Sequence, residues 1–300
     1  MNLLVAIEAF VKVAELGSYT KAAEQLDISR TQLSKLVMQL EEHLNVRLLQ
    51  RTTRRLHLTE AGQNYLVRSQ GILQALQDAE AELSQGHSQI SGRLRINGPM
   101  SFGTRYLAPL VAQFMAQHPQ LEVRLELNDR KIDLLEDGFD LAIRIGTLPD
   151  SSLVARQLTQ CQLLLVASPA YLSANGSPTD IDDLHQHQCL KYRRGGVTYW
   201  PIKGKNIAID GPLESNNGEV LTYAAEAGLG IAFQPSFLVD DSIKAGRLKV
   251  VLPGQQLLQL GIYGVYPARR HLPAKVKAFL DFLAQAWGSP PYWENEIIPQ

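Results

Sequence analysis

Residues 18–44 read SYTKAAEQLDISRTQLSKLVMQLEEHL, two helical patterns separated by a break at Asp27 and Ile28. Ser18 can cap the first helix, and Ser29 can cap the second, with Gln32 three residues later at the spacing of a capping box. One side of the second helix is apolar and consists of Leu33, Val37, Leu40 and Leu44. The other side carries Thr31, Ser34, Lys35 and Met38. The pattern predicts a helix that packs through one face and presents short polar side chains on the other.

The flanking segments extend this pattern to a small domain over residues 1–59. An N-terminal helix is predicted because apolar residues recur at helical spacing at Leu3, Ile7, Phe10 and Ala14. After the third helix, VRLLQRTTRRLHLT predicts a short hairpin with a polar tip at residues 52–55. Three helices followed by a hairpin are typical of a winged helix-turn-helix domain.

Charge in this segment suits nucleic acid. Between Arg30 and Leu58 there are six Lys or Arg residues and two acids, a local basic excess of four. The polar face of the third helix is narrow enough to enter a major groove, where its side chains can bond base edges and phosphates. The hairpin arginines would then lie near the flanking backbone or the minor groove. Taken alone, the polar face is equally consistent with an ordinary solvated helix surface.

A long helix is predicted next, from Ala61 to about Gln85, with Thr59 and Glu60 at its cap. Apolar and small residues alternate in steps of three and four at Tyr65, Ser69, Ile72, Leu76, Ala79 and Leu83. This is a heptad seam, and an isolated helix has nothing of its own to cover it. The seam indicates a partner, most simply the same helix of a second chain. Packing on the chain's own domains is the alternative.

The segment GHSQISG at residues 86–92 predicts a hinge, and strands alternate with helices beyond it. Predicted strands include GRLRIN, LEVRLEL, FDLAIRIG, LLLVAS, GIAFQ and LGIYGVYP; predicted helices include RYLAPLVAQFMAQ, IDLLEDG and AKVKAFLDFLAQAW. Alternating strands and helices favour a parallel or mixed sheet with helices on both faces.

Composition bounds the class of protein. The 300 residues allow about two domains, with 45% apolar and 20% charged residues, as in an ordinary globular chain. No uncharged apolar run reaches the roughly 18 residues that a membrane span needs. The first 17 residues carry Glu8, Lys12 and Glu15 and are not typical of a secretory signal. The two cysteines do not form a disulfide framework, so we expect a reducing, cytoplasmic setting.

Several motifs together carry a family resemblance. GSYTKAAEQL, the Ser29 and Ser34 pair, LEEHLNVRLLQRTTR and LTEAG resemble the N-terminal domain of the LysR-type transcriptional regulators. GRLRINGPMSFG, GFDLAIRIGTLPDSSLVAR, LVASPAYL and EAGLGIAFQPSFLV resemble the sensing domain of one large subgroup of that family. Two positions depart from the family pattern, Arg30 where Gln is common and Leu33 where Val or Ile is common. Arg30 could add a phosphate or guanine contact.

The resemblance implies a fold and a set of partners. Residues 1–59 would form an all-α winged helix-turn-helix domain, 60–86 a linker helix for dimerisation and 87–92 a hinge. Residues 93–290 would form an α/β domain like a type 2 periplasmic binding protein, with lobe one at 93–161 and 267–290 and lobe two at 162–266. Residues 291–300 are a tail that matches no pattern. Members bind promoter DNA, form homodimers or homotetramers and take a small-molecule effector; RNA polymerase is a further candidate partner. No cofactor, metal, catalysis or membrane is implied.

The candidate site residues follow from this organisation. For DNA binding they are Ser18, Thr20, Ser29, Arg30, Thr31, Gln32, Ser34, Lys35, Met38, Arg51, Arg54 and Arg55. For dimerisation they are Tyr65, Ile72, Leu76 and Leu83. Ligands of open α/β sheets bind beyond the carboxyl ends of the strands. That rule selects Met100, Ser101, Phe102, Asn128, Asp129, Arg144, Asn216, Asn217 and Gln234 for the effector. Each has a structural alternative as a cap or turn, and Arg144 could pair with Asp129 or Asp140.

Three rival interpretations remain at this stage. His185, His187 and Cys189 alternate and are metal-ligand types, although a fourth ligand is not evident. Cys161 and Cys189 could sense redox state, although buried inert thiols are common. A solute-binding protein that never touches DNA would explain the C-terminal half, but not the basic N-terminal segment.

Overall fold

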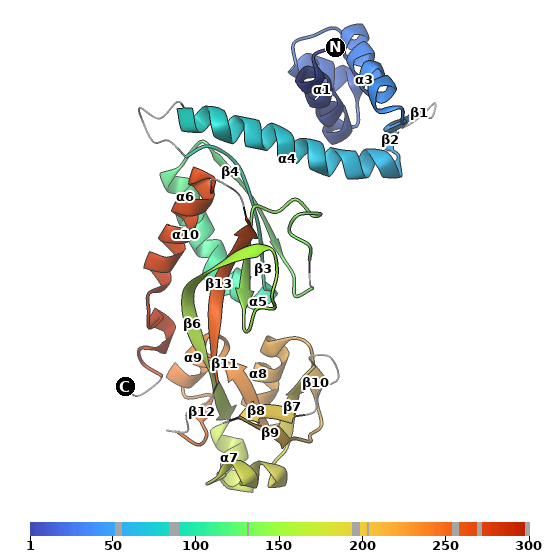
Figure 1. The fold of residues 1–300 in the computed structure, drawn as a ribbon. Coiled ribbons are helices and arrows are strands. Elements are labelled where there is room, and N and C mark those ends of the chain that lie inside the picture. Colours follow the sequence, from blue (N-terminus) through green and yellow to red (C-terminus); the bar gives the residue numbers. More distant parts are fainter. Residues whose placement is uncertain are drawn as a thin grey trace.

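The computed structural model describes residues 1–51, 56–83, 90–130, 132–193, 199–202, 204–253, 258–268 and 272–297. A small helical domain at the N-terminus leads into one long helix, and an elongated α/β domain of two lobes follows (Figure 1). No helix within these ranges is long and apolar enough to cross a lipid bilayer.

The N-terminal domain has the predicted helix-turn-helix with a wing. Its elements are α1 (Leu3–Leu16), α2 (Tyr19–Gln25), α3 (Arg30–Leu44), β1 (Leu49–Arg51) and β2 (Leu56–Leu58). The predicted caps form, since the hydroxyl of Ser18 accepts from the Lys21 amide and that of Ser29 accepts from the Gln32 amide. The core closes around Phe10, whose side chain is fully buried, together with the apolar face of α3.

The linker helix α4 (Glu60–Leu83) lies against this domain along its first turns. Tyr65, assigned from sequence to the dimer seam, packs on Phe10 of the same chain with ring centroids 5.8 Å apart, and Ser69 is fully buried. Ile72 and Leu76, further along the seam, are 50% and 39% exposed. The chain's own domain therefore covers the first part of the predicted seam and leaves the middle open, while the side chain of Leu83 lies outside the described residues.

The α/β domain is built on one sheet of nine strands, ordered β10-β7-β11-β6-β13-β5-β3-β4, with β12 also paired to β6. In lobe one, β3 (Gly92–Gly98), β4 (Leu121–Leu127) and β5 (Leu141–Ile145) are parallel. A continuous helical segment connects β3 to β4 and comprises α5 (Met100–Phe102), the short π-helix η1 (Gly103–Leu107) and α6 (Ala108–Gln117). Helix α10 (Ala274–Trp287) packs beside α6 (Figure 1).

Lobe two contains strands β7 (Cys189–Tyr192), β10 (Glu214–Ser215), β11 (Ile231–Pro235) and β12 (Lys249–Val250), with a hairpin of β8 (Tyr199–Ile202) and β9 (Lys205–Ala208). Its helices are α7 (Pro169–Asn175), η2 (Ile181–Gln186), α8 (Gly218–Glu226) and α9 (Ser236–Lys244). A final turn, η3 (Tyr292–Glu294), follows α10.

Two antiparallel strands cross between the lobes, β6 (Leu153–Ala167) and β13 (Gln259–Pro267). Their pairing shifts register between Ile262 and Tyr263, close to the point where the chain passes from one lobe to the other. Strand β13 already pairs with β5 of lobe one from Ile262 to Val265. The return to lobe one therefore begins a few residues before position 267, where the sequence places it, because the strand joins the sheet of lobe one before it ends.

Candidate DNA interface and effector cleft

Helix α3 presents its polar face outward. Leu33, Val37 and Leu40 are at most 1% exposed, whereas Thr31 and Lys35 are exposed and Met38 is 46% exposed. Ser34 is half-buried between the two faces. The remaining DNA candidates from α2 and the start of α3 lie on the same domain surface, with Thr20, Ser29, Arg30 and Gln32 exposed and Ser18 half-buried. The helix can therefore enter a groove without unpacking the core.

The wing is held to α3 by a carboxylate that the sequence analysis did not select. Glu41 is 8% exposed, and its Oε1 accepts hydrogen bonds from the amides of Leu48 and Leu49 at 2.8 and 3.0 Å. Its Oε2 pairs with Arg47 at 3.0 Å. The signal was present, because Glu41 lies four residues after Val37 on the buried face. Of the wing arginines, Arg54 and Arg55 lie outside the described residues, as does the side chain of Arg51.

We expect Glu41→Ala to loosen the wing. The substitution leaves two buried backbone amides without acceptors, and an unsatisfied buried donor costs about 1–3 kcal/mol. Glu41→Gln is the matched control, since its amide oxygen can still accept both bonds and only the pair with the exposed Arg47 is lost. Urea unfolding should show a lower midpoint for the alanine variant than for the glutamine variant. Equal midpoints would show that the carboxylate does not anchor the wing.

Lobe one places a guanidinium at the carboxyl end of its parallel strands. Arg144 of β5 donates to Oδ1 of Asn97 at 2.7 Å and to the Ile143 carbonyl at 3.0 Å. Asn97, fully buried, donates in turn to the Glu126 carbonyl. Burial lowers the pKa of Arg144, and no carboxylate in the described part of the chain forms an ion pair with it. The sequence analysis did not select Asn97. Its position could have been noticed, because it is a polar amide residue that follows Leu94 and Ile96 in a predicted strand.

The acids proposed as structural partners of Arg144 are engaged elsewhere. Oδ1 of Asp129 accepts from the Met100 amide at 3.0 Å and so caps the turn that begins α5. Oδ2 of Asp140 accepts from the Arg95 amide. Among the described residues, neither acid therefore pairs with Arg144, and Asp129 takes the capping role that was its structural alternative.

The other lobe-one candidates differ in exposure. Met100 is 43% exposed and Ser101 is half-buried. Asn128 is half-buried, and its Oδ1 has no hydrogen-bond partner among the described residues. Phe102, assigned from sequence to the cleft, is instead fully buried against Tyr106 and Trp287. The helical turn at α5 points its ring into the core, a direction that a strand-end rule does not capture.

Lobe two contributes polar groups from β11 and the start of α8. Gln234 is 1% exposed, and its Nε2 has no partner within the described residues. A Cβ at Gly218 would lie 2.9 Å from Oε1 of Gln234, so β11 and the first turn of α8 are in close contact. Asn217 caps α8 by accepting from the Glu219 amide at 2.8 Å. Asn216 is exposed and lines a pocket of about 490 Å³ with Arg193, Glu214 and Ser215.

Neither the metal nor the redox interpretation gains support from the geometry. His187 contacts the hydroxyl of Tyr171 through Nδ1 at 3.2 Å, and within the described ranges no three His, Cys, Asp or Glu side chains form a metal-binding group. Cys161 and Cys189 are both fully buried. Burial raises the pKa of Cys189 to about 12 and also raises that of Cys161, which favours the protonated thiol at both positions.

A winged helix-turn-helix with an exposed polar helix, joined by a long helix to a two-lobed α/β domain, defines a DNA-binding protein with a sensing domain. Comparison with known proteins agrees. Residues 4–63 match the family described as bacterial regulatory helix-turn-helix protein, lysR family, and residues 87–288 match the LysR substrate binding domain. The chain belongs to the LysR family of transcriptional regulators, which are not enzymes.

Relatives match over nearly their whole length. An uncharacterized HTH-type transcriptional regulator of Haemophilus influenzae is 46% identical over 281 residues, covering 92% of this chain and 98% of that protein. The solved structure of CrgA, a LysR-type transcriptional regulator from Neisseria meningitidis, is 36% identical with a TM-score of 0.60, covering 94% and 97% of the two chains. The full-length structure of the Vibrio cholerae virulence activator AphB is 31% identical with a TM-score of 0.57, covering 94% and 98%.

Proposed function

We propose that this chain is a sequence-specific regulator of promoter DNA whose binding changes when a small molecule occupies the cleft between its two lobes. The outward polar face of α3, opposite an apolar face whose Leu33, Val37 and Leu40 are buried, is the observation that carries the DNA-binding part. Double-stranded DNA in the cytoplasm is the partner, and RNA polymerase is a further candidate. Sequencing the DNA that co-purifies with the chain, followed by footprinting of the enriched sites, tests this proposal. Failure to enrich any sequence would contradict it.

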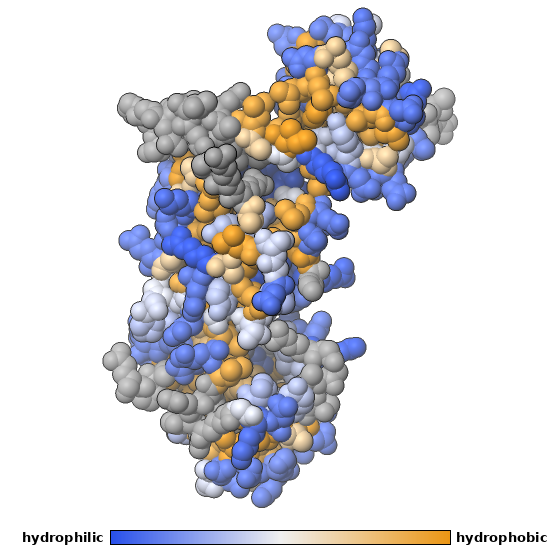
Figure 2. Space-filling model, viewed as in Figure 1, coloured by the Kyte–Doolittle hydropathy of each residue, from blue (hydrophilic) through white to orange (hydrophobic). Residues whose placement is uncertain are grey.

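A second copy of the chain is the proposed partner of the open part of the linker helix. Ile72 and Leu76 on α4 are exposed, as are Leu3 and Leu4 on α1. Figure 2 shows apolar surface on the N-terminal domain where it faces α4. A dimer formed here would place two copies of α3 at a fixed spacing on the duplex. Analytical ultracentrifugation should show a dimer or tetramer that Ile72→Glu weakens.

The chemistry of the cleft favours an effector with an anionic group. Arg144 is half-buried without an acidic partner among the described residues, and a desolvated charge of this kind is stabilised by a bound counter-charge. Asn128 offers an oxygen from lobe one and Gln234 offers an amide nitrogen from lobe two, and neither atom has a hydrogen-bond partner in the part of the chain that the structure describes. An effector that meets groups from both lobes binds one lobe arrangement better than another, and so shifts the balance between them.

A chain of polar contacts connects lobe one to the DNA-binding domain. Nη2 of Arg95 on β3 donates to Oε1 of Gln70 on α4 at 3.1 Å, and Nε2 of Gln70 donates to Oε1 of Glu15 on α1 at 2.8 Å. Arg93 also faces Glu15, at 3.9 Å. A change in lobe arrangement that moves β3 would therefore act on α4 and α1 together. We propose that this changes the spacing of the two DNA-binding domains and the bend of the bound DNA.

Arg144→Ala should abolish the response to an anionic effector and leave DNA binding intact. The measurement is a thermal-shift screen of small carboxylates, because a ligand that binds only the folded chain raises the melting temperature with its concentration. A carboxylate that stabilises the wild-type chain should have no effect on Arg144→Ala and a reduced effect on Arg144→Lys, which keeps the charge but not the planar fork. An unchanged shift in the alanine variant would remove Arg144 from the effector site.

A further inference from the structure

The residues after α10 pack against the α/β domain. Trp293 is fully buried, Glu294 is 5% exposed and Ile297 is 6% exposed, values typical of the domain core itself. Trp293 and Ile297 belong to the same hydrophobic cluster as Phe102 and Trp287. A segment with no recognisable sequence pattern thus buries Trp293 and Ile297 as completely as core side chains, whereas its Tyr292 is 50% exposed.

This segment, residues 288–297, contacts lobe one through aromatic rings. The ring of Trp293 lies 4.8 Å from that of Tyr106 and 5.9 Å from that of Phe102, measured between centroids. Both partners sit on the helical segment that follows β3 in lobe one. Tyr292 stands beside them, 6.1 Å from Tyr106. Burial of the Trp293 ring against these partners holds the segment on lobe one.

The same segment contacts lobe two and the crossover strand through a carboxylate. Oε1 of Glu294 accepts from the hydroxyl of Ser236, the first residue of α9, at 2.6 Å, and from the amide of Gln162 on β6 at 2.7 Å. Two further contacts lie at its ends: the Gly288 carbonyl accepts from Thr159 of β6, and Glu296 pairs with Lys244 of α9 at 3.5 Å. Trp293 thus contacts lobe one, and the adjacent Glu294 contacts lobe two.

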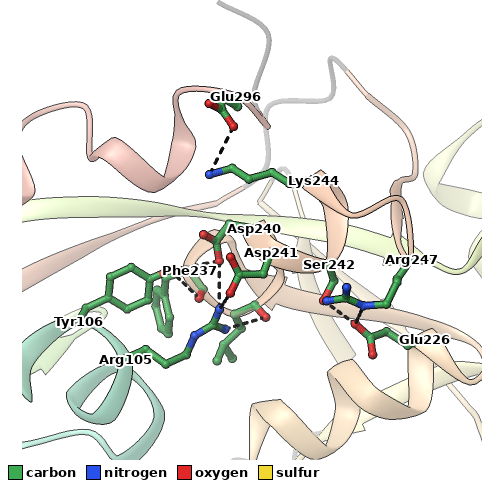
Figure 3. A network of polar contacts seen from close by, with 11 residues as sticks. Arg105, Tyr106, Glu226, Phe237, Asp240, Asp241, Ser242, Lys244, Arg247 and Glu296 are labelled. Atoms are coloured by element: carbon green, nitrogen blue, oxygen red, sulfur yellow. Dashed lines mark hydrogen bonds and ion pairs between the residues drawn. The ribbon is translucent and has the colours of Figure 1, made fainter. Parts of the chain in front are cut away.

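The lobes also contact each other directly beside this segment. Arg105 of lobe one pairs with Asp241 and, at 3.5 Å, with Asp240, both on α9 of lobe two (Figure 3). Its Nη1 donates to the Leu238 carbonyl. The hydroxyl of Tyr106 donates to Oδ1 of Asp240 at 3.1 Å. Together with the segment 288–297, these contacts form an interlobe seam between η1 and α9.

We propose that residues 288–297 are an interlobe strap, which keeps the seam between η1 and α9 closed and so restricts lobe movement to rotation about that seam. The strap sets how far the effector cleft opens at rest, an inference that rests on the proposed effector function for its regulatory consequence. The covalent connections between the lobes are the crossover strands β6 and β13, and paired strands can bend and twist. A buried strap that contacts both lobes restricts this bending and twisting.

The test uses Glu294→Ala in the full-length chain, with two controls. The alanine variant leaves the Ser236 hydroxyl and the Gln162 amide without their acceptor. Glu294→Gln keeps an acceptor oxygen in place, and Asn295→Ala changes the exposed neighbour. Should Glu294→Ala fail to fold, Ser236→Ala removes one of the two hydrogen bonds and takes its place.

Two measurements are made on each variant. Hydrogen exchange reports whether the Gln162 amide loses protection, and we expect exchange at least roughly tenfold faster in Glu294→Ala. The distance between the lobes is measured by electron spin resonance with labels at Lys277→Cys on α10 and Gln186→Cys on η2. Labelled chains are diluted with unlabelled chains so that only intrachain pairs report. The native cysteines are fully buried and do not compete for label.

We expect a longer and broader distance distribution in Glu294→Ala, and wild-type distributions in Glu294→Gln and Asn295→Ala. Faster exchange with an unchanged distance would overturn the proposal, since the segment would then be packed without restraining the lobes. Unchanged exchange would overturn it as well, because the carboxylate would not hold the segment. Footprinting of the wild-type chain tests the proposed function separately. If the wild-type chain shows no specific DNA binding, the proposed function fails, but the measured distances still decide whether the segment restrains the lobes.

Discussion

Replacing Ser34 and Lys35 together by alanine should remove most of the specific DNA affinity of this chain. Lys35 is exposed on α3 and Ser34 is half-buried, whereas the core contacts of the helix come from the buried Leu33 and Leu40, so neither substitution removes a core side chain. Each specific contact that is lost costs about 1–3 kcal/mol. The double variant should therefore bind its enriched sites roughly 30- to 10⁴-fold more weakly, while its unfolding curve stays close to that of the wild type.

The measurement is fluorescence anisotropy on a labelled duplex over a range of salt concentrations. Loss of a phosphate contact by Lys35 should also reduce the salt slope by about one. Lys277→Ala on α10 is the matched control, because it removes the same charge from an exposed site in the sensing domain. DNA binding that survives in the double variant would mean that another surface reads the site.

Local patterns predicted the part of the fold that local forces decide. The caps at Ser18 and Ser29 form within three residues of chain, and the burial of Val37 follows from helical periodicity alone. The alternation of strands and helices likewise predicted the mixed sheet with its helices. These features depend on neighbours along the chain, so the sequence displays them directly.

Positions set by tertiary contacts were harder to predict. The segment IDLLEDG was expected to be helical, but residues 134–138 form turns, in which Oδ1 of Asp133 accepts from the amides of Leu135 and Glu136. Short side-chain bonds of this kind compete with a helix. Phe102 turns inward because rings from other segments surround it, including Phe237 and Trp293. Contacts between residues so far apart in the sequence produce no periodic pattern from which they could be predicted.

Glu41 and Arg144 show how far residue type alone can lead. An acid on the buried face of α3 predicts a specific partner, yet that partner is a pair of backbone amides, which no sequence pattern marks. Arg144 was selected by its place at a strand end. The structure shows that Asp129 and Asp140 bond to backbone amides instead. Arg144 therefore has no acidic neighbour among the described residues, and this makes it a candidate for binding an anion.

Gly62→Ala should destabilise the junction between the wing and the linker helix. The amide of Gly62 donates to the hydroxyl of Thr59, and that hydroxyl donates to the carbonyls of Arg47 and Leu48. A Cβ at position 62 would lie 2.0 Å from the Leu48 carbonyl oxygen. The obstacle is backbone and cannot rotate aside, so α4 or the wing must move. We expect a cost of about 1–3 kcal/mol or more, as for overpacked cores.

Gly71→Ala in the same helix is the matched control. A Cβ there would meet nothing within 4 Å, so this variant should gain about 0.5–1 kcal/mol from lower backbone entropy in the unfolded chain. Both variants share that gain, and the difference between their urea midpoints isolates the clash at Leu48. Specific DNA affinity should fall only in Gly62→Ala, because displacement of α4 tilts the wing of β1 and β2 relative to α3. Coincident unfolding curves would show that α4 does not begin against the wing.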